Sequence, residues 1–130
     1  MRPAREDLVD LLLSLAPDDG DVSAKRVFGQ FGLFVNGNMC AGVHEGDVVL
    51  RLTDDDLAEL LGLDGARPFE PMGRPMLEYA CVPPGMQSDR PELESWLARS
   101  LAYARSLPPK AVRKPARPAP TQTRPQARAS

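Results

Sequence analysis

The stretch that decides the fold is "FGLFVNGNMCAGVHEGDVVLRL", which runs from Phe31 to Leu52. Asn36–Gly37 is the strongest short signal for a β-hairpin in the chain, because both residues accept a positive φ. Glu45–Gly46 marks a second tight turn, and branched or aromatic residues fill the segments around both turns. The stretch and its N-terminal extension "RVFGQ" therefore predict three consecutive antiparallel strands, over residues 26–35, 38–44 and 47–52.

Two-residue turns also fix which residues face each other across the strands. The first turn pairs Phe34 with Met39 and Leu33 with Cys40, and the second pairs Ala41 with Leu50. Since side chains alternate between the two faces of a sheet, one face is predicted to be the core. That face carries Phe34, Met39, Ala41, Val43, Val48, Leu50 and Leu52. The other face is mixed and carries Phe31, Leu33, Val35, Val49, Cys40, Arg51, His44 and Asp47.

Part of the mixed face is predicted to contact a protein partner or a second copy of the chain. In a two-layer fold the helices cover one face of the sheet and leave the other open. An apolar patch beside an arginine is typical of protein interfaces. The predicted partner face consists of Phe31, Leu33, Val35, Val49 and Arg51. The alternative is that the final helix folds over these residues, which would make them core.

Helical patterns flank the strands. Leucines at helical spacing predict a first helix over residues 4–16, and Pro17 ends it. Thr53 is an expected N-cap for a second, short helix that ends at Gly62, with three aspartates in its first turn. Two strand-like runs, "RPFEP" and "PMLEYACVP", follow and are joined by the turn "MGR". Asp89 and Glu92 form a capping box for a third helix. The order predicts an α+β, two-layer α-β3-α-β2-α domain with an antiparallel sheet.

Charge divides the chain into two parts. Residues 108–130 hold six basic residues and no acid, whereas residues 1–107 hold 10 basic and 18 acidic residues, so the charges are +6 and −8. The C-terminal part has one valine and no larger apolar side chain, and we expect it to be a disordered tail beside a domain over residues 1–107. Its charges predict non-specific contact with nucleic acid, and the alternative is a solubilising role. The six residues are Lys110, Arg113, Lys114, Arg117, Arg124 and Arg128.

Cys40 and His44 are the residues most suggestive of chemistry, as a nucleophile with its base or as two metal ligands. On one strand they would share a face but lie about 13 Å apart, beyond hydrogen-bond reach. Cys81 does not complete a usual zinc-ligand pattern. We therefore expect no catalytic, metal or cofactor site, and the aspartates after Thr53 are read as a helix start. If Arg51 mildly activates the thiol of Cys40, the chain would be a thiol enzyme, and this is kept as a distant alternative.

The N-terminal segment does not resemble an export signal, because Glu6, Asp7 and Asp10 interrupt its short apolar run. No run approaches the length of about 20 apolar residues that spans a membrane. Two cysteines do not make a disulfide framework. We expect a cytoplasmic protein without a membrane partner.

Several of these motifs together resemble the N-terminal domain of the TfoX/Sxy family, whose namesakes regulate bacterial competence. The resemblance rests on "VFGQFGLFVNGNMCAGV", "DVVLRL", "PFEPMGRPMLEYACVP" and the acid-capped final helix, and it covers about residues 4–107. It implies the same α-β3-α-β2-α order and a regulatory or interaction role, linked to transcription or competence, rather than a reaction. The full-length regulators carry a second, helical domain, and here a basic, proline-rich tail stands in its place.

Overall fold

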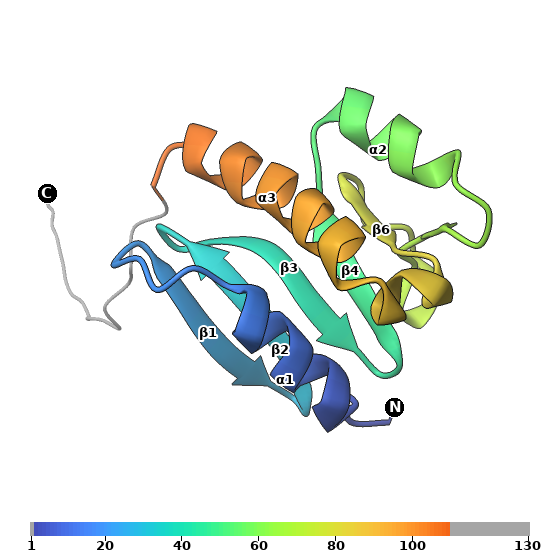
Figure 1. Ribbon diagram of the computed structural model, residues 1–130, viewed down its shortest axis with the longest axis horizontal. Helices are drawn as coiled ribbons and strands as arrows, with labels where there is room; N and C mark the ends of the chain where they lie inside the picture. The colour runs from blue at the N-terminus through green and yellow to red at the C-terminus, as the bar shows by residue number, and fades with distance from the viewer. Residues whose placement is uncertain (1, 110–130) are drawn as a thin grey trace, which may run out of the picture.

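Six strands form one antiparallel sheet, and helices α1 and α3 lie against one of its faces (Figure 1). The computed structural model describes residues 2–109. The helices are α1 (Glu6–Leu15), α2 (Asp54–Leu61) and α3 (Arg90–Ser106), with short 3-10 turns η1 (Pro71–Gly73) and η2 (Pro84–Ser88). The strands are β1 (Val22–Val27), β2 (Gln30–Val35), β3 (Asn38–His44), β4 (Asp47–Arg51), β5 (Arg67–Pro68) and β6 (Tyr79–Cys81). The α+β class and the antiparallel sheet are confirmed.

The sheet order is β1-β2-β3-β4-β6-β5. The sheet has one strand more than predicted, because the first predicted strand forms two strands, β1 and β2. The predicted strand over residues 26–35 is interrupted by a tight turn at Phe28–Gly29, so β1 and β2 form a hairpin. Both turn residues have positive φ, 51° and 81°. A bulky residue rarely adopts that conformation, which explains why the sequence did not predict a turn there.

A bulge between β2 and β3 changes the predicted faces. Phe34 pairs with Met39 as expected, but Leu33 pairs with Ala41, so Cys40 is an extra residue on β3. The predicted pairing of Leu33 with Cys40 is wrong, whereas the predicted β3–β4 register is confirmed. The residues of β2 therefore point to the opposite sides from those predicted.

The core consequently contains residues that were assigned to the open side. Phe31, Leu33 and Val35 belong to the buried cluster beneath the helices, and Leu33 is only 1% exposed. The alternative, in which these three residues are core, is the one observed. Phe34 and Met39, which were predicted to be core, lie on the other side of the sheet. The core also includes Val9, Leu12, Ala41, Val43, Val48, Leu50, Ala80, Leu93 and Leu97.

The predicted N-cap residues, Thr53 and Asp89, are confirmed, but the capping box is not complete, because Glu92 accepts from Trp96 Nε1 and the backbone N–H of Asp89 donates to Met86. The Thr53 side chain accepts a hydrogen bond from the backbone N–H of Asp56 at 3.2 Å, and Gly62 follows the last turn of α2. Asp89 accepts from the backbone N–H of Glu92 at 3.3 Å and opens α3. These bonds satisfy N–H groups that have no partner within the helix.

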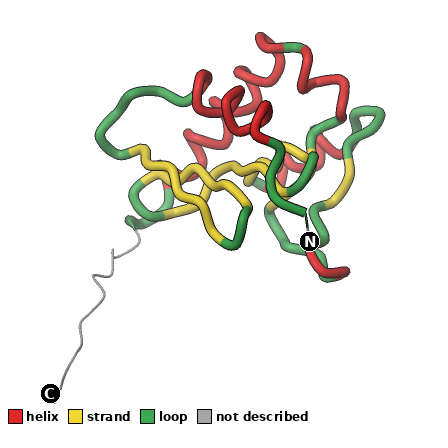
Figure 2. Tube along the Cα trace, turned by 90° about the horizontal axis from the view of Figure 1, so that it is seen from below, coloured by secondary structure: helices red, strands yellow, loops and turns green. Residues whose placement is uncertain are grey.

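The face of the sheet opposite α1 and α3 is called the open face here. Figure 2 shows the molecule turned by 90° from Figure 1, with helices and strands in different colours. β5 and β6 pair through Arg67 with Cys81 and Pro68 with Ala80, and the residues between them form a long excursion rather than the predicted short turn. Phe69 of that excursion contacts His44 on the open face, with ring centroids 5.2 Å apart. The excursion therefore covers the β4–β6 side of the open face.

Two further predictions concern membrane-spanning segments and the basic C-terminal end of the chain. Within residues 2–109, no helix is long and apolar enough to cross a membrane. The six basic residues predicted to contact nucleic acid, Lys110, Arg113, Lys114, Arg117, Arg124 and Arg128, lie outside the described residues. The domain boundary at residue 107 therefore stays a prediction.

Candidate functional site

The open face is apolar and indented where β2 and β3 run side by side. Phe34 and Met39 lie on it, half-buried, next to Gly32 and Gly42. Two small hollows of about 60 and 100 Å³ lie beside Met39, and Gly42 and Gly32 are among the residues that line them. Val27, at the end of β1, lines the larger hollow. No helix within residues 2–109 covers this part of the face.

The predicted partner face is therefore not a single surface. Phe31, Leu33 and Val35 lie in the core, whereas Val49 and Arg51 are on neighbouring positions of β4. Val49 is 1% exposed, and it lines the smaller hollow together with Phe69. The face that could meet a partner carries different residues, Phe34 and Met39, which sequence reasoning placed in the core.

Arg51 lies at the end of β4 in a small polar cluster. Its Nε donates to Glu78 at 2.8 Å, and the Tyr103 hydroxyl donates to the other carboxylate oxygen at 3.0 Å. The guanidinium also lies 5.6 Å from the ring centre of Tyr79 and 5.7 Å from that of Tyr103. The cluster ties α3 to the sheet, and the Arg51 hydrogen bond holds the pKa of Glu78 below its usual value.

This cluster predicts a pH-dependent contribution to stability. A carboxylate with a lowered pKa stabilises the fold above the unfolded-state pKa and loses that effect as the pH falls through its folded-state pKa. We expect Glu78→Gln to destabilise the domain near pH 7 by less than about 1 kcal/mol, since the pair is partly exposed. The cost should be smaller at an acidic pH such as 3, because the wild type takes up a proton on Glu78 and loses the ion pair as the pH falls through the folded-state pKa. Urea unfolding at both pH values measures it, and equal costs would contradict the prediction.

Cys40 and His44 do not form a site. The sequence pattern placed them on one face of the sheet, but in the structure they lie on opposite faces. Cys40 belongs to the core beneath the helices, whereas His44 contacts Phe69 on the open face. Burial raises the pKa of the Cys40 thiol to about 12, and this outweighs the nearby charges of Arg105 and Arg51. The raised pKa argues against the distant alternative of a Cys40 thiol activated by Arg51. Cys81 is also buried, and burial raises the pKa of its thiol to about 11.

Both thiols are expected to react slowly in the folded protein. At pH 8 an ordinary cysteine with a pKa of about 8.5 is roughly one quarter thiolate, whereas a pKa of about 11 leaves about 0.1%. We expect labelling of Cys40 and Cys81 by a disulfide reagent to be at least about 100-fold slower in the native chain than in denaturant. Rapid labelling of either thiol in the native chain, followed by mass spectrometry, would refute this.

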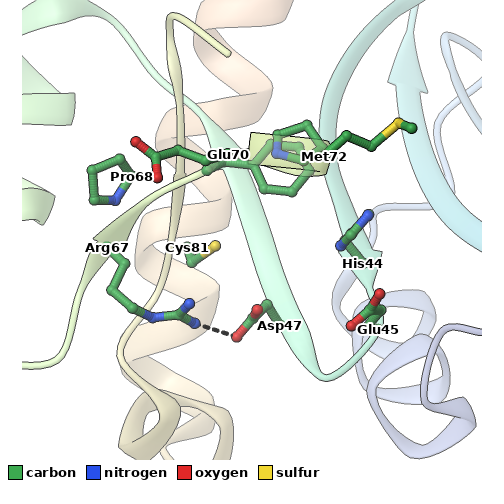
Figure 3. A pocket seen from close by; sticks show the side chains of 10 residues that line it. His44, Glu45, Asp47, Arg67, Pro68, Glu70, Met72 and Cys81 are labelled. Atoms are coloured by element: carbon green, nitrogen blue, oxygen red, sulfur yellow. Dashed lines mark hydrogen bonds and ion pairs between the residues drawn. The ribbon is translucent and has the colours of Figure 1, made fainter. Parts of the chain in front are cut away.

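An open pocket of about 490 Å³ lies where the β3–β4 turn meets β5 and β6. In Figure 3, His44 and Glu45 lie on one side of it and Arg67 and Pro68 on the other, with Cys81 between them. Arg67 forms an ion pair with Asp47. Phe69, Glu70, Pro71 and Met72 complete the wall. Residues 2–109 contain no group of three His, Cys, Asp or Glu side chains arranged to hold a metal ion.

Sequence reasoning did not find this pocket. Its residues span positions 44–81 and follow no spacing that a motif would show. They meet only because β6 pairs with both β4 and β5, and because the excursion after β5 returns over the sheet.

The comparisons with known proteins agree with the fold. A family model described as the TfoX N-terminal domain matches residues 13–104, most of the described chain. The match covers the sheet, α2 and nearly all of α3. No match is found among curated proteins.

Proposed function

The chain belongs to the TfoX N-terminal domain family, and we propose that it is a small, non-enzymatic regulatory module that acts by protein contact. The family supports a role in the control of transcription or competence. The proposed contact surface is the open face around Phe34 and Met39, and the proposed occupant is a second copy of the chain. The observation that carries the proposal is the apolar centre of the open face, which none of the helices described by the structure covers.

The shape of the open face favours a contact between identical surfaces. In a two-fold contact the same patch meets itself, so it must contain both protruding side chains and hollows. Here the Phe34 ring and the Met39 methyl group lie over Gly32 and Gly42, and two small hollows lie beside them. A second copy could place its Met39 in a hollow of the first. Sheets packed face to face in this way form ordinary protein cores.

Charge favours the same surface over the others. Residues 1–107 carry a charge of −8, so two copies repel each other wherever their acidic surfaces meet. β2 and β3 contain no Asp, Glu, Lys or Arg. Pairing through the exposed edge strand β1 is disfavoured, because it would bring together Lys25 of both copies. Lys25 lies over the Phe34 ring at 5.2 Å, at the rim of the open face.

The chemistry of the thiols supports a non-enzymatic role. Cys40 and Cys81 are buried with raised pKa values, about 12 and about 11. Nucleophilic catalysis needs an accessible thiolate.

Sedimentation velocity over a concentration series tests the proposed function. The wild type should show a monomer–dimer equilibrium, and Met39→Glu should shift it toward monomer by at least about tenfold in Kd, since a contact would bury two like charges. Leu13→Glu, a matched change at an exposed apolar residue of α1, should leave the equilibrium unchanged. A wild type that stays monomeric at all concentrations would contradict a second copy as the occupant. Equal weakening by both variants would contradict the open face.

The basic C-terminal segment favours a second candidate function, association with nucleic acid. An acidic domain repels DNA, so binding would depend on the +6 charge of residues 108–130. We expect the full-length chain to bind duplex DNA with an affinity that falls up to about 10³-fold between 50 and 200 mM salt. A variant with the six basic residues changed to Gln should lose this binding. Fluorescence anisotropy measures both, and equal binding by the variant would exclude this function.

A further inference from the structure

The surface between α1 and the edge strand β1 is hollowed, and the hollow is called the α1–β1 groove here. Its volume is about 320 Å³. Its apolar walls come from α1, the residues after α1, and strands β1 and β2: Leu13, Ala16, Pro17, Val22, Ala24 and Leu33. Leu13 is 47% exposed, so the groove presents apolar surface to water. Covering such a surface is favourable.

The outer edge of β1 can pair with a further extended segment. β1 is the first strand of the sheet, so it has no neighbour on its outer side among residues 2–109. The turn at Phe28–Gly29 makes Val27 and Gln30 a hydrogen-bonded pair, and the pattern alternates along β1. Ala24 and Arg26 therefore direct their backbone N–H and C=O groups away from β2. A segment added to this edge places alternate side chains over the α1–β1 groove.

The described chain ends close to this groove. Arg105, in the last turn of α3, donates to Asp21 and Asp19 in the loop before β1, each at 2.9 Å. The Asn38 side chain donates to the carbonyl of Pro108 at 3.0 Å. Asn38 is two strands away from the start of β1, which at about 4.8 Å per strand is about 10 Å. About three extended residues span that distance, and Figure 1 shows the end of α3 and the start of β1 at the same end of the molecule.

The rim of the groove carries the charge opposite to that of the segment that follows residue 109. Asp10 lies one helical turn after Glu6, which pairs with Arg26 of β1. Asp18 lines the groove at its other end. Among residues 2–109, neither Asp10 nor Asp18 forms an ion pair. Residues 110–130 hold six basic residues and no acid.

We propose that residues 110–114 dock in the α1–β1 groove of their own chain. In an extended segment Lys110, Val112 and Lys114 share one side. Val112 covers the apolar walls, and the two lysines lie beside Asp18 and Asp10. Because the segment is tethered to α3, it meets the groove at an effective concentration of about 1 mM, so a weak contact suffices. This contact does not depend on self-association through the open face.

Other occupants suit the groove less well. Nucleic acid is repelled by the aspartates at its rim. A second copy of the domain would bring two acidic rims together. Nucleic acid and the groove compete for Lys110 and Lys114, so docking lowers the affinity of the full chain for DNA.

Paramagnetic relaxation in the full chain tests the docking. A nitroxide is attached at Ala116→Cys in ¹⁵N-labelled protein, in which Cys40 and Cys81 are buried. We expect the amide signals of Leu13 and Ala24, in the groove, to lose more intensity than that of Asn38, which lies where the described chain ends. A segment that does not dock would broaden Asn38 most, and this result would overturn the proposal.

Variants then assign the effect to the groove and to the segment. Asp10→Asn with Asp18→Asn should reduce the paramagnetic broadening of the groove amides at least about twofold, and so should Val112→Ser. Asp55→Asn with Glu94→Gln removes the same charge from exposed positions of α2 and α3 and should leave the broadening unchanged. Broadening in the groove variant equal to that in the wild type would overturn the proposal.

A mixed sample separates docking within one chain from docking between chains. The ¹⁵N-labelled wild type is mixed with unlabelled chain that carries the nitroxide. We expect the groove amides of the wild type to keep their intensity in this mixture. Broadening as strong as in the chain that carries both labels would place the segment in the groove of another copy and overturn docking within the chain.

Discussion

Leu33→Lys is expected to leave the chain largely unfolded. Leu33 lies on the helix side of β2 and is 1% exposed, within the core cluster that α1 and α3 cover. The substitution removes a buried leucine and places a charge where no water can reach it, which together should cost more than about 4 kcal/mol. That is a large part of the stability of a domain of this size. Circular dichroism and the dispersion of amide resonances measure the outcome.

Phe34→Lys is the matched control, one residue further along the same strand. Phe34 lies on the open face and is half-buried, so a lysine there can extend its ammonium group into water. We expect this variant to keep its fold and to self-associate less. If Leu33→Lys stays folded and Phe34→Lys unfolds, the two sides of β2 are the reverse of those described here.

Gly42→Ala is expected to destabilise the domain by about 2–3 kcal/mol, although it adds one methyl group. A Cβ at this position would lie 2.5 Å from the backbone oxygen of Phe31 and 2.9 Å from Cε of Met39. Met39 can move aside, but Phe31 belongs to the neighbouring strand, so the β2–β3 pairing itself must shift. The free energy of unfolding in urea measures the effect.

Gly20→Ala is the control for this prediction. A Cβ added at Gly20 would meet no heavy atom within 4 Å beyond its chain neighbours, and the backbone of Gly20 is not in the left-handed region. The change should alter the free energy of unfolding by no more than about 0.5 kcal/mol. Similar costs at positions 20 and 42 would show that the close approach at Gly42 is relieved without loss of stability.

Short sequence signals, each set by one or two residues, predicted much of the fold. Asn36–Gly37 is a turn between β2 and β3, and Thr53 and Asp89 cap their helices. The failures occurred where the backbone departs from the preferences of its residues. Phe28 adopts a positive φ of 51°, so the β1–β2 turn had no signal. The extra residue at Cys40 reversed the sides of β2, because a shift of one residue moves every side chain to the other face.

The candidate sites were less predictable than the fold. An ideal register placed the predicted partner face on Leu33 and its neighbours. Because of the bulge, these residues face the core, and Phe34 and Met39 lie on the open face instead. The exposure and the pKa of Cys40 depend on packing by α3, which its neighbours in sequence do not encode. The pocket of about 490 Å³ forms from three separate segments, and only their pairing in the sheet brings them together.

The open face as a contact between two copies is tested most directly by an isotope-filtered NOE experiment. Labelled and unlabelled full-length chains are mixed in equal amounts, so that the filter selects contacts between copies. The proposed self-contact predicts NOEs from the Met39 methyl group to the Phe34 ring and to the Gly32 and Gly42 backbone protons of the second copy. Intermolecular contacts confined to α1, α3 or the edge of β1, with none from Met39, would contradict the account.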